Sequence, residues 1–207
     1  ILLDEPLGAL DKKLREQMQI EIRRLHSKLG ITMVNVTHDQ HEALTMSDRI
    51  VLMNNGRIEQ QGGPEELYFQ PRSVFAADFL GNANLIPATV QRLDGEVVQL
   101  NTAFGSITAP QPSFEISSGE AVRVLIRPEN MRLTGDSGPN EAGCKGKLNE
   151  VIVLGSIVRH LVQVGELEVM VEDQNRRGRP LLRRGSRVSL CWDPADARVI
   201  RTNSTDY

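Results

Sequence analysis

The chain has 207 residues, of which 40% are hydrophobic and 25% charged, and its formal net charge is −3. This balance supplies enough apolar material for a buried core and excludes wholesale disorder, while the negative charge argues against nucleic acid as the main partner. No apolar run approaches the roughly 20 residues that span a bilayer. The two cysteines, Cys144 and Cys191, are too few for a disulfide framework or a zinc site.

The N-terminal segments predict a strand followed by a long helix. The chain opens without Met inside the apolar run Ile1-Leu2-Leu3, which we interpret as a buried strand in an N-terminally truncated sequence. Residues 12–29 predict an amphipathic helix that begins after Asp11 as N-cap and stops at Gly30. Its apolar stripe, which we expect to lie in the core, consists of Leu14, Met18, Ile22, Leu25 and Leu29.

The next segments continue the alternation of strands and helices. Expected strands cover residues 31–36, 49–53 and 57–61, and expected helices cover residues 40–46, a turn beginning at residue 64, and residues 74–80. The tripeptide Asn54-Asn55-Gly56 predicts a tight hairpin turn between the last two strands. Strand, helix, strand, helix, strand is the pattern of a parallel α/β sheet.

The sequence pattern changes near Gly81-Asn82, so we place a domain boundary there, with domains at residues 1–82 and 83–207. Short β-like runs then recur at residues 86–93, 97–100, 122–126, 148–154, 157–164, 167–171, 188–191 and 198–200. Many short strands with polar turns favour a small all-β barrel. Residues 136–146, rich in Gly, Pro and Asn, predict a flexible loop, and we find no long-period repeat.

Two adjacent carboxylates, Asp4 and Glu5, follow directly after the first strand. Ligands of open α/β sheets bind at the carboxyl ends of the strands, where one carboxylate suits Mg²⁺ and the next can polarise an attacking water. Taken alone, the motif also fits an ordinary strand end with a solvated acidic turn. The residues that follow decide between these interpretations.

Asp4-Glu5-Pro6 leads directly into Leu7-Gly8-Ala9-Leu10-Asp11, and one helix and one strand later comes Val36-Thr37-His38-Asp39. This order resembles the ABC-type ATPase domain, with its Walker B strand, D-loop and switch histidine. The resemblance implies ATP and Mg²⁺ as cofactors. It assigns Asp4 to Mg²⁺ through water, Glu5 to the catalytic base, Asp11 to a contact across an ATP-sandwich dimer, and His38 to the γ-phosphate.

Further stretches are similar to the importer class of these ATPases. They are Glu42-Ala43-Leu44, Ser47-Asp48-Arg49-Ile50 and Gly56-Arg57-Ile58. Residues 14–19 and 79–86 look most like polyamine-importer ATPases, and Ile126-Arg127-Pro128-Glu129 resembles an element of their C-terminal OB-like (TOBE) domain. The implied fold is the C-terminal portion of an α/β P-loop NTPase, the ABC ATPase domain, followed by a small all-β OB-like barrel.

No Gly-x-x-x-x-Gly-Lys-Ser/Thr phosphate loop and no Ser-Gly-Gly-Gln signature occur in the chain. Because the phosphate loop supplies the amides and lysine that hold the phosphates, we expect the 207-residue chain to be inactive alone. The resemblance implies that the full-length subunit works as a homodimer, peripheral on the cytoplasmic side of the bacterial membrane. Its partners would be transmembrane permease subunits and, indirectly, a solute-binding protein.

The cargo and one rival function stay open at this point. The resemblance favours spermidine or putrescine, with ferric ion, a sugar or another organic solute as alternatives. A different class of function is an OB-type module that binds nucleic acid or an effector through the arginines of residues 176–184. Nucleic-acid sites of this kind need aromatic stacking platforms, and the second domain has few aromatics, chiefly Phe104, Phe114 and Trp192. We expect Trp192 in the core of the barrel.

Overall fold

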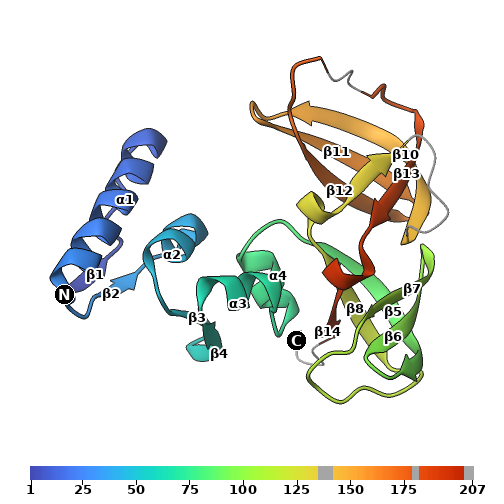
Figure 1. Ribbon diagram of the computed structural model, residues 1–207, viewed down its shortest axis with the longest axis horizontal. Helices are drawn as coiled ribbons and strands as arrows, with labels where there is room; N and C mark the ends of the chain where they lie inside the picture. Colours follow the sequence, from blue (N-terminus) through green and yellow to red (C-terminus); the bar gives the residue numbers. More distant parts are fainter. Residues whose placement is uncertain (135–141, 179–181, 203–207) are drawn as a thin grey trace. The chain divides into compact units, whose positions relative to one another are not determined.

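The computed structural model describes residues 1–134, 142–178 and 182–202, which form two compact units, Ile1–Gly81 and Asn82–Tyr207 (Figure 1). The boundary inferred from the sequence lies next to this division. Unit 1 contains all four α-helices of the described chain, and unit 2 is built from β-strands and two single 3₁₀ turns.

Unit 1 begins with a parallel pair of strands. Its elements are β1 (Leu2–Asp4), α1 (Lys12–Leu29), β2 (Val34–Val36), α2 (Gln40–Met46), β3 (Ile50–Asn54), β4 (Arg57–Gly62), α3 (Pro64–Phe69) and α4 (Val74–Phe79). β1 and β2 pair in parallel, with Asp4 opposite Val36. The carboxyl ends of both strands therefore lie at one edge, and the polar residues that follow them are neighbours.

Both ends of α1 follow from local sequence. The Asp11 carboxylate accepts a hydrogen bond from the Leu14 backbone N–H at 3.0 Å, which satisfies a free donor of the first turn. Gly30 has φ 62°, a left-handed conformation that glycine adopts at little cost, and its N–H donates to the His26 carbonyl. Both predicted caps are confirmed.

The third expected strand does not join the parallel pair. Asn55 and Gly56 have φ values of 49° and 75°, so the turn between β3 and β4 has positive φ at both central positions, as tight hairpins require. β3 accordingly pairs antiparallel with β4, as predicted from the Asn-Asn-Gly turn. Among the described residues neither strand contacts β1 or β2 through a ladder, so the expectation of one parallel sheet holding all three strands is wrong.

The prediction that the apolar stripe of α1 lies in the core is also wrong. Leu14, Leu25 and Leu29 are exposed, and Met18 and Ile22 are only partly buried. The buried cluster of unit 1 lies elsewhere, on the hairpin and the short helices, and consists of Ile50, Leu52, Leu67, Ala76 and Leu80. The periodicity identified the helix correctly but not its burial, because a two-stranded sheet is too narrow to cover an 18-residue helix.

Unit 2 contains two five-stranded antiparallel sheets (Figure 1). The strands are β5 (Asn84–Asp94), β6 (Val97–Thr102), β7 (Gly105–Pro110), β8 (Ala121–Ile126), β9 (Arg132–Thr134), β10 (Ala142–Val153), β11 (Ile157–Val164), β12 (Leu167–Gln174), β13 (Arg187–Trp192) and β14 (Arg198–Arg201). The sheet orders are β14-β8-β5-β6-β7 and β12-β11-β10-β13-β9.

The two sheets are built on one plan and exchange a strand. In each half of the unit a three-strand meander is followed by a fourth strand that pairs with the first, then by a 3₁₀ turn (Pro128–Asn130 or Pro194–Asp196) and a fifth strand. The fifth strand of each half, β9 or β14, pairs in the sheet of the other half. The unit is thus an internal repeat, which the sequence analysis did not detect.

A single core joins the two sheets. Its buried residues come from strands of both, among them Val90, Leu100, Val162 and Leu190. The edge strands of each sheet, β7 with β14 and β9 with β12, also approach each other, although no hydrogen-bonded ladder joins them among the described strands. Two strongly curved five-stranded sheets agree with the expectation of an OB-like domain.

The predicted flexible loop at residues 136–146 is wrong in part. Residues 135–141 lie outside the described chain, but residues 142–146 belong to β10, which pairs with β13. A Cβ on Gly146 would lie 2.5 Å from Val162 Cγ1 and 2.9 Å from the Gln163 carbonyl oxygen. Glycine stands there because the neighbouring strand approaches closely, and not because the backbone is free to move.

Candidate functional site

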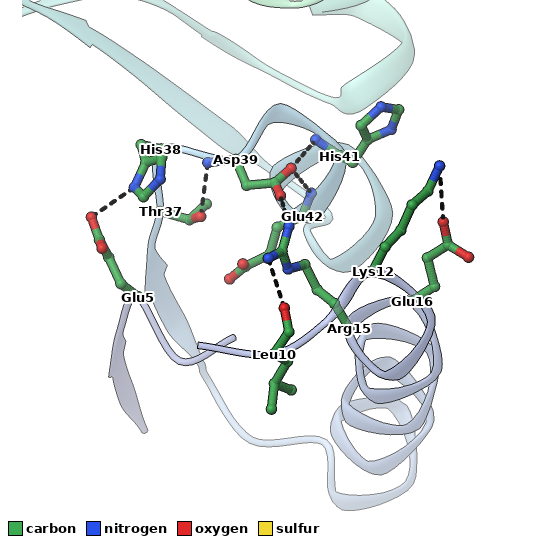
Figure 2. Close-up of polar contacts among 10 residues, drawn as sticks. All are labelled: Glu5, Leu10, Lys12, Arg15, Glu16, Thr37, His38, Asp39, His41 and Glu42. Atoms are coloured by element: carbon green, nitrogen blue, oxygen red, sulfur yellow. Dashed lines mark hydrogen bonds and ion pairs between the residues drawn. The ribbon is translucent and has the colours of Figure 1, made fainter. Parts of the chain in front are cut away.

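The parallel pairing of β1 and β2 brings Glu5 and His38 together. The Glu5 N–H donates to the Val36 carbonyl at 2.9 Å, which extends the pairing by one residue beyond the strand. The side chains then meet across the edge, with His38 Nδ1 and Glu5 Oε1 2.8 Å apart (Figure 2). Both are open to solvent, with 77% of the histidine and 55% of the glutamate side chain exposed.

Glu5 has an unusual backbone conformation. Its φ is 44°, in the left-handed region that a residue with a Cβ seldom occupies, and the only other non-glycine case in the described chain is Asn55. Asn tolerates this region in turns, whereas a glutamate gains nothing locally from it. Such strain persists where the surroundings impose it, and it is frequent at functional sites.

The carboxylate raises the pKa of His38 above its ordinary value of 6.5, first through the hydrogen bond that Glu5 accepts from the ring and then through the Glu5 charge. Asp39 and Glu42 add smaller contributions in the same direction. A raised pKa favours the imidazolium, in which both ring nitrogens carry protons. Nδ1 then donates to Glu5, and Nε2 is left as a charged donor for an anionic oxygen.

Asp39 organises the loop that carries His38. Its Oδ1 accepts from the backbone N–H groups of His41 and Glu42, at 2.8 and 3.2 Å, and so caps α2. Its own N–H donates to Thr37 Oγ1 at 3.0 Å. Residues 37–39, which we call the His38 loop, are therefore held at both ends by short side-chain contacts.

The other two predicted site residues lie nearby in sequence but do not contact the pair. Asp4 is exposed at the end of β1, and its carboxylate makes no hydrogen bond or ion pair with another described residue. Asp11 uses its carboxylate to cap α1. An exposed single carboxylate beside a glutamate fits Mg²⁺, which keeps most of its waters and takes one or two carboxylates from protein.

Arg15, which none of the sequence motifs indicated, joins the two loops of the site. From α1 it donates through Nη1 to Asp39 Oδ2 at 3.3 Å and through Nη2 to the Leu10 carbonyl at 2.9 Å (Figure 2). A signal was present in the sequence. Arg15 stands in the first turn of a helix that has no acidic residue there, where the helix dipole disfavours a cation.

The structure bears on the rival function of unit 2. Trp192 is 1% exposed in the shared core, as predicted, and its ring lies beside that of Phe104, with centroids 6.1 Å apart. Phe114 packs against the same core, and the Arg201 guanidinium covers its ring at 4.8 Å from the centroid. None of these rings forms an open platform for base stacking, and Arg179 of the arginine run lies outside the described residues.

Comparison with known proteins identifies relatives along almost the whole chain. A spermidine/putrescine import ATP-binding protein, PotA, of Rubrobacter xylanophilus is 44% identical over 203 residues, 97% of this chain and 53% of the relative. The protein of the same name from Pseudomonas aeruginosa is 44% identical over 93% of this chain and 54% of its own length. Residues 124–200 match the TOBE domain family.

The chain is similar over most of its length to proteins named import ATP-binding proteins. It spans about half the length of the curated relatives that it matches. Among solved structures, the cytoplasmic molybdate-binding protein ModG aligns with 56% of the chain at 13% identity and a TM-score of 0.48. Within the described residues, no helix is long and apolar enough to cross a membrane, and no three His, Cys, Asp or Glu side chains gather as metal ligands.

Proposed function

We propose that this chain is the C-terminal part of an ATP-hydrolysing subunit of a bacterial ABC importer. The observation that carries the proposal is the Glu5–His38 pair at the edge of the β1–β2 pair, in a chain whose relatives are named ATP-binding proteins. Residues 1–82 would belong to the P-loop ATPase domain, and residues 83–207 form the TOBE-containing accessory domain.

His38 is proposed to hold the γ-phosphate. In its protonated form Nδ1 is fixed by Glu5, so Nε2 presents a positively charged donor in a defined direction. This geometry needs no rearrangement when charge develops on the phosphate during hydrolysis. A neutral His38 whose one proton lies on Nδ1 would have no donor left for the phosphate, so the raised pKa supports this role.

Glu5 is proposed as the catalytic base. Oε1 is occupied by His38, and Oε2 has no partner among the described residues, so it is available to orient and polarise the attacking water. Asp4 would hold Mg²⁺ through water, and the metal, when bound, would neutralise charge on the phosphates. Asp11 would contact the second ATP-binding subunit of a homodimer.

The phosphate-binding groups are absent from this sequence, as no phosphate-loop motif occurs in it. We therefore propose that the 207-residue chain neither binds nor hydrolyses ATP appreciably by itself. Isothermal titration of the purified chain with Mg-ATP tests this directly. Saturable binding, or turnover of ATP, would overturn it.

The proposed cargo is a polyamine, because the named relatives import spermidine or putrescine. The subunit would act at the cytoplasmic face of the cell membrane with permease subunits and, indirectly, a solute-binding protein. Ferric ion, a sugar or another organic solute is the alternative cargo. An experiment with the assembled transporter in vesicles compares spermidine with maltose and separates these possibilities. Only the true cargo should be taken up and stimulate ATP turnover.

The decisive experiment on the site uses the full-length subunit assembled with its permeases. Glu5→Gln keeps the size and hydrogen-bonding ability of the side chain but removes the base, and we expect kcat to fall by roughly 10²-fold or more. Glu16→Gln on the exposed face of α1 removes the same charge and serves as the control. A Glu5→Gln subunit with wild-type turnover would contradict the proposed mechanism.

A further inference from the structure

The contacts around the site close into a ring that passes through α1. Beginning at Glu5, the carbonyl accepts from the Gly8 N–H at 3.3 Å, and the Leu7 carbonyl accepts from the Leu10 N–H at 3.1 Å, which together shape residues 7–11 into a turn. The Leu10 carbonyl then accepts from Arg15, and Arg15 also donates to Asp39 beside His38. His38 returns the ring to Glu5.

Arg15 is the one link of this ring that comes from a helix. Its side chain is 31% exposed, and that of Asp39 is 26% exposed, so the ion pair is better shielded than the surface pairs of α1. The two contacts leave from different nitrogens of one rigid guanidinium, so the Leu10 carbonyl and the Asp39 carboxylate are held in fixed relation. A lysine has one nitrogen in place of this fork and cannot hold both in the same geometry.

We propose that Arg15 is a positioning residue that couples the turn of residues 7–11 to the His38 loop. This inference rests on the proposed function, in which the turn faces the second subunit and His38 faces the phosphate. A displacement of the turn moves the Leu10 carbonyl, and the guanidinium passes that displacement to Asp39. The hydrogen bonds of the Arg15 side chain go to these two loops, so in this proposal it acts through them.

Two substitutions break the link and leave the helices capped. Arg15→Lys keeps the charge but loses the fork. Asp39→Asn keeps the Oδ1 acceptor that caps α2, because Asn is as good an N-cap as Asp, but turns an NH₂ group toward the donors of Arg15. Arg24→Gln is the matched control, since Arg24 makes an exposed surface pair with Glu21 on the same helix.

The experiment measures steady-state ATP hydrolysis by the full-length subunit assembled with its permeases. We expect Arg15→Lys and Asp39→Asn each to lower kcat by roughly tenfold with KM changed by less than about twofold, because misplacement of catalytic groups affects turnover more than binding. The double variant should be no slower than either single variant, as both remove one link. Arg24→Gln should match the wild type.

Three outcomes would overturn the coupling: wild-type kcat in Arg15→Lys, multiplicative effects in the double variant, or losses of kcat that follow losses of melting temperature. A wild-type subunit without ATP turnover would instead refute the proposed function.

Nuclear magnetic resonance of the 207-residue chain then tests the link separately. Asp39→Asn should shift the Leu10 and Asp11 amide signals in the Arg15 chain but not in the Arg15→Lys chain, and equal shifts in both would refute it.

Discussion

The strained backbone of Glu5 brings its side chain into contact with His38. β1 ends at Asp4, and the left-handed φ of Glu5 turns the chain at once, so that the side chain meets the histidine that follows the neighbouring strand. The cost of such a conformation, on the order of 1 to 3 kcal/mol, is carried by the flanking ladder and turn. The electrostatic result is a histidine that is held in place and whose pKa is raised.

Replacing Glu5 by Gln is expected to lower the pKa of His38 toward 6.5, because the hydrogen bond would no longer go to a charged carboxylate and the Glu5 charge is lost. Titration of the imidazole ring signals of the 207-residue chain by nuclear magnetic resonance measures this. Glu16→Gln is the charge-matched control. Equal His38 pKa values in wild type and Glu5→Gln would rule out the pair in solution.

The same shift fixes the direction of a pH effect on stability. The folded-state pKa of His38 lies above its unfolded value, so the pair contributes stability that is fully present below about pH 6.5. That contribution is lost as the pH rises through the folded-state pKa. In Glu5→Gln this part of the pH dependence should disappear.

Single residues were predictable from the sequence where their contacts are local. The caps of α1 at Asp11 and Gly30 depend on neighbours within four residues and are confirmed. The burial of Trp192 follows from its size and apolar surroundings. Arg15 was missed because its partner Asp39 lies on a different element, and no local rule reports that contact. The catalytic roles of Asp4, Glu5, Asp11 and His38 stay predictions.

At the scale of elements, short turn motifs predicted the local structure correctly, but the sequence did not predict which strands pair with each other. The Asn-Asn-Gly turn predicted the β3–β4 hairpin correctly, since its positive φ values are a local requirement. The same reasoning could not show that the hairpin stands outside the β1–β2 pair. The exchange of β9 and β14 is likewise non-local, because each strand pairs in the half of unit 2 to which it does not belong by sequence.

The internal repeat was overlooked because few identities survive in it. The turn at Pro128 is followed by Arg132, and the turn at Pro194 is followed at the same spacing by Arg198, but most other positions differ. The preserved feature is the pattern of elements, with a strand, a 3₁₀ turn that starts at proline, and a strand that crosses over. Such a pattern is apparent only once strand pairing is known.

The close approach of β11 to Gly146 predicts that β10 does not accept a side chain at this position without a loss of stability. In Gly146→Ala the new Cβ would contact Val162 and the Gln163 carbonyl, so the strands must separate, and we expect a loss of about 1–3 kcal/mol. Urea unfolding followed by fluorescence of Trp192, the one tryptophan, measures it. Gly165→Asn is the control, because its φ of 59° suits Asn and a Cβ meets nothing within 4 Å. Equal midpoints for the two variants would argue against a close strand contact.

Asn84, at the start of β5, acts as a substitute for a strand partner. Its side-chain amide donates to the Met170 carbonyl at 2.7 Å and accepts from the Met170 N–H at 2.8 Å, while only 6% of the residue is exposed. Asn84→Ala removes these partners from both backbone groups of the partly buried Met170. We expect a loss of about 1–3 kcal/mol in the unfolding free energy of unit 2, against little change for the exposed Asn101→Ala. An unchanged midpoint would mean that other groups satisfy Met170.

At the scale of the whole molecule, the two units differ in how well each buries its apolar residues. The core of unit 2 draws on both of its sheets, including Leu100 from one and Val171 and Leu190 from the other, whereas unit 1 leaves large side chains such as Leu2, Val36 and Ile58 more than half exposed. Stability increases with apolar area removed from water, at about 25 cal/mol per Å². Unit 1 of this chain should therefore be the weaker of the two.

This difference predicts two separate unfolding transitions in urea. All α-helices of the described chain lie in unit 1, so circular dichroism at the helix band reports that unit, while the single tryptophan, Trp192, reports the core of unit 2. We expect the helix signal to be lost at a lower urea concentration than the tryptophan signal, because little apolar area holds unit 1 together. Asn84→Ala provides the control, since it should move the tryptophan transition and leave the helix transition in place. Coincident transitions that move together in Asn84→Ala would show instead that the units unfold as one cooperative body.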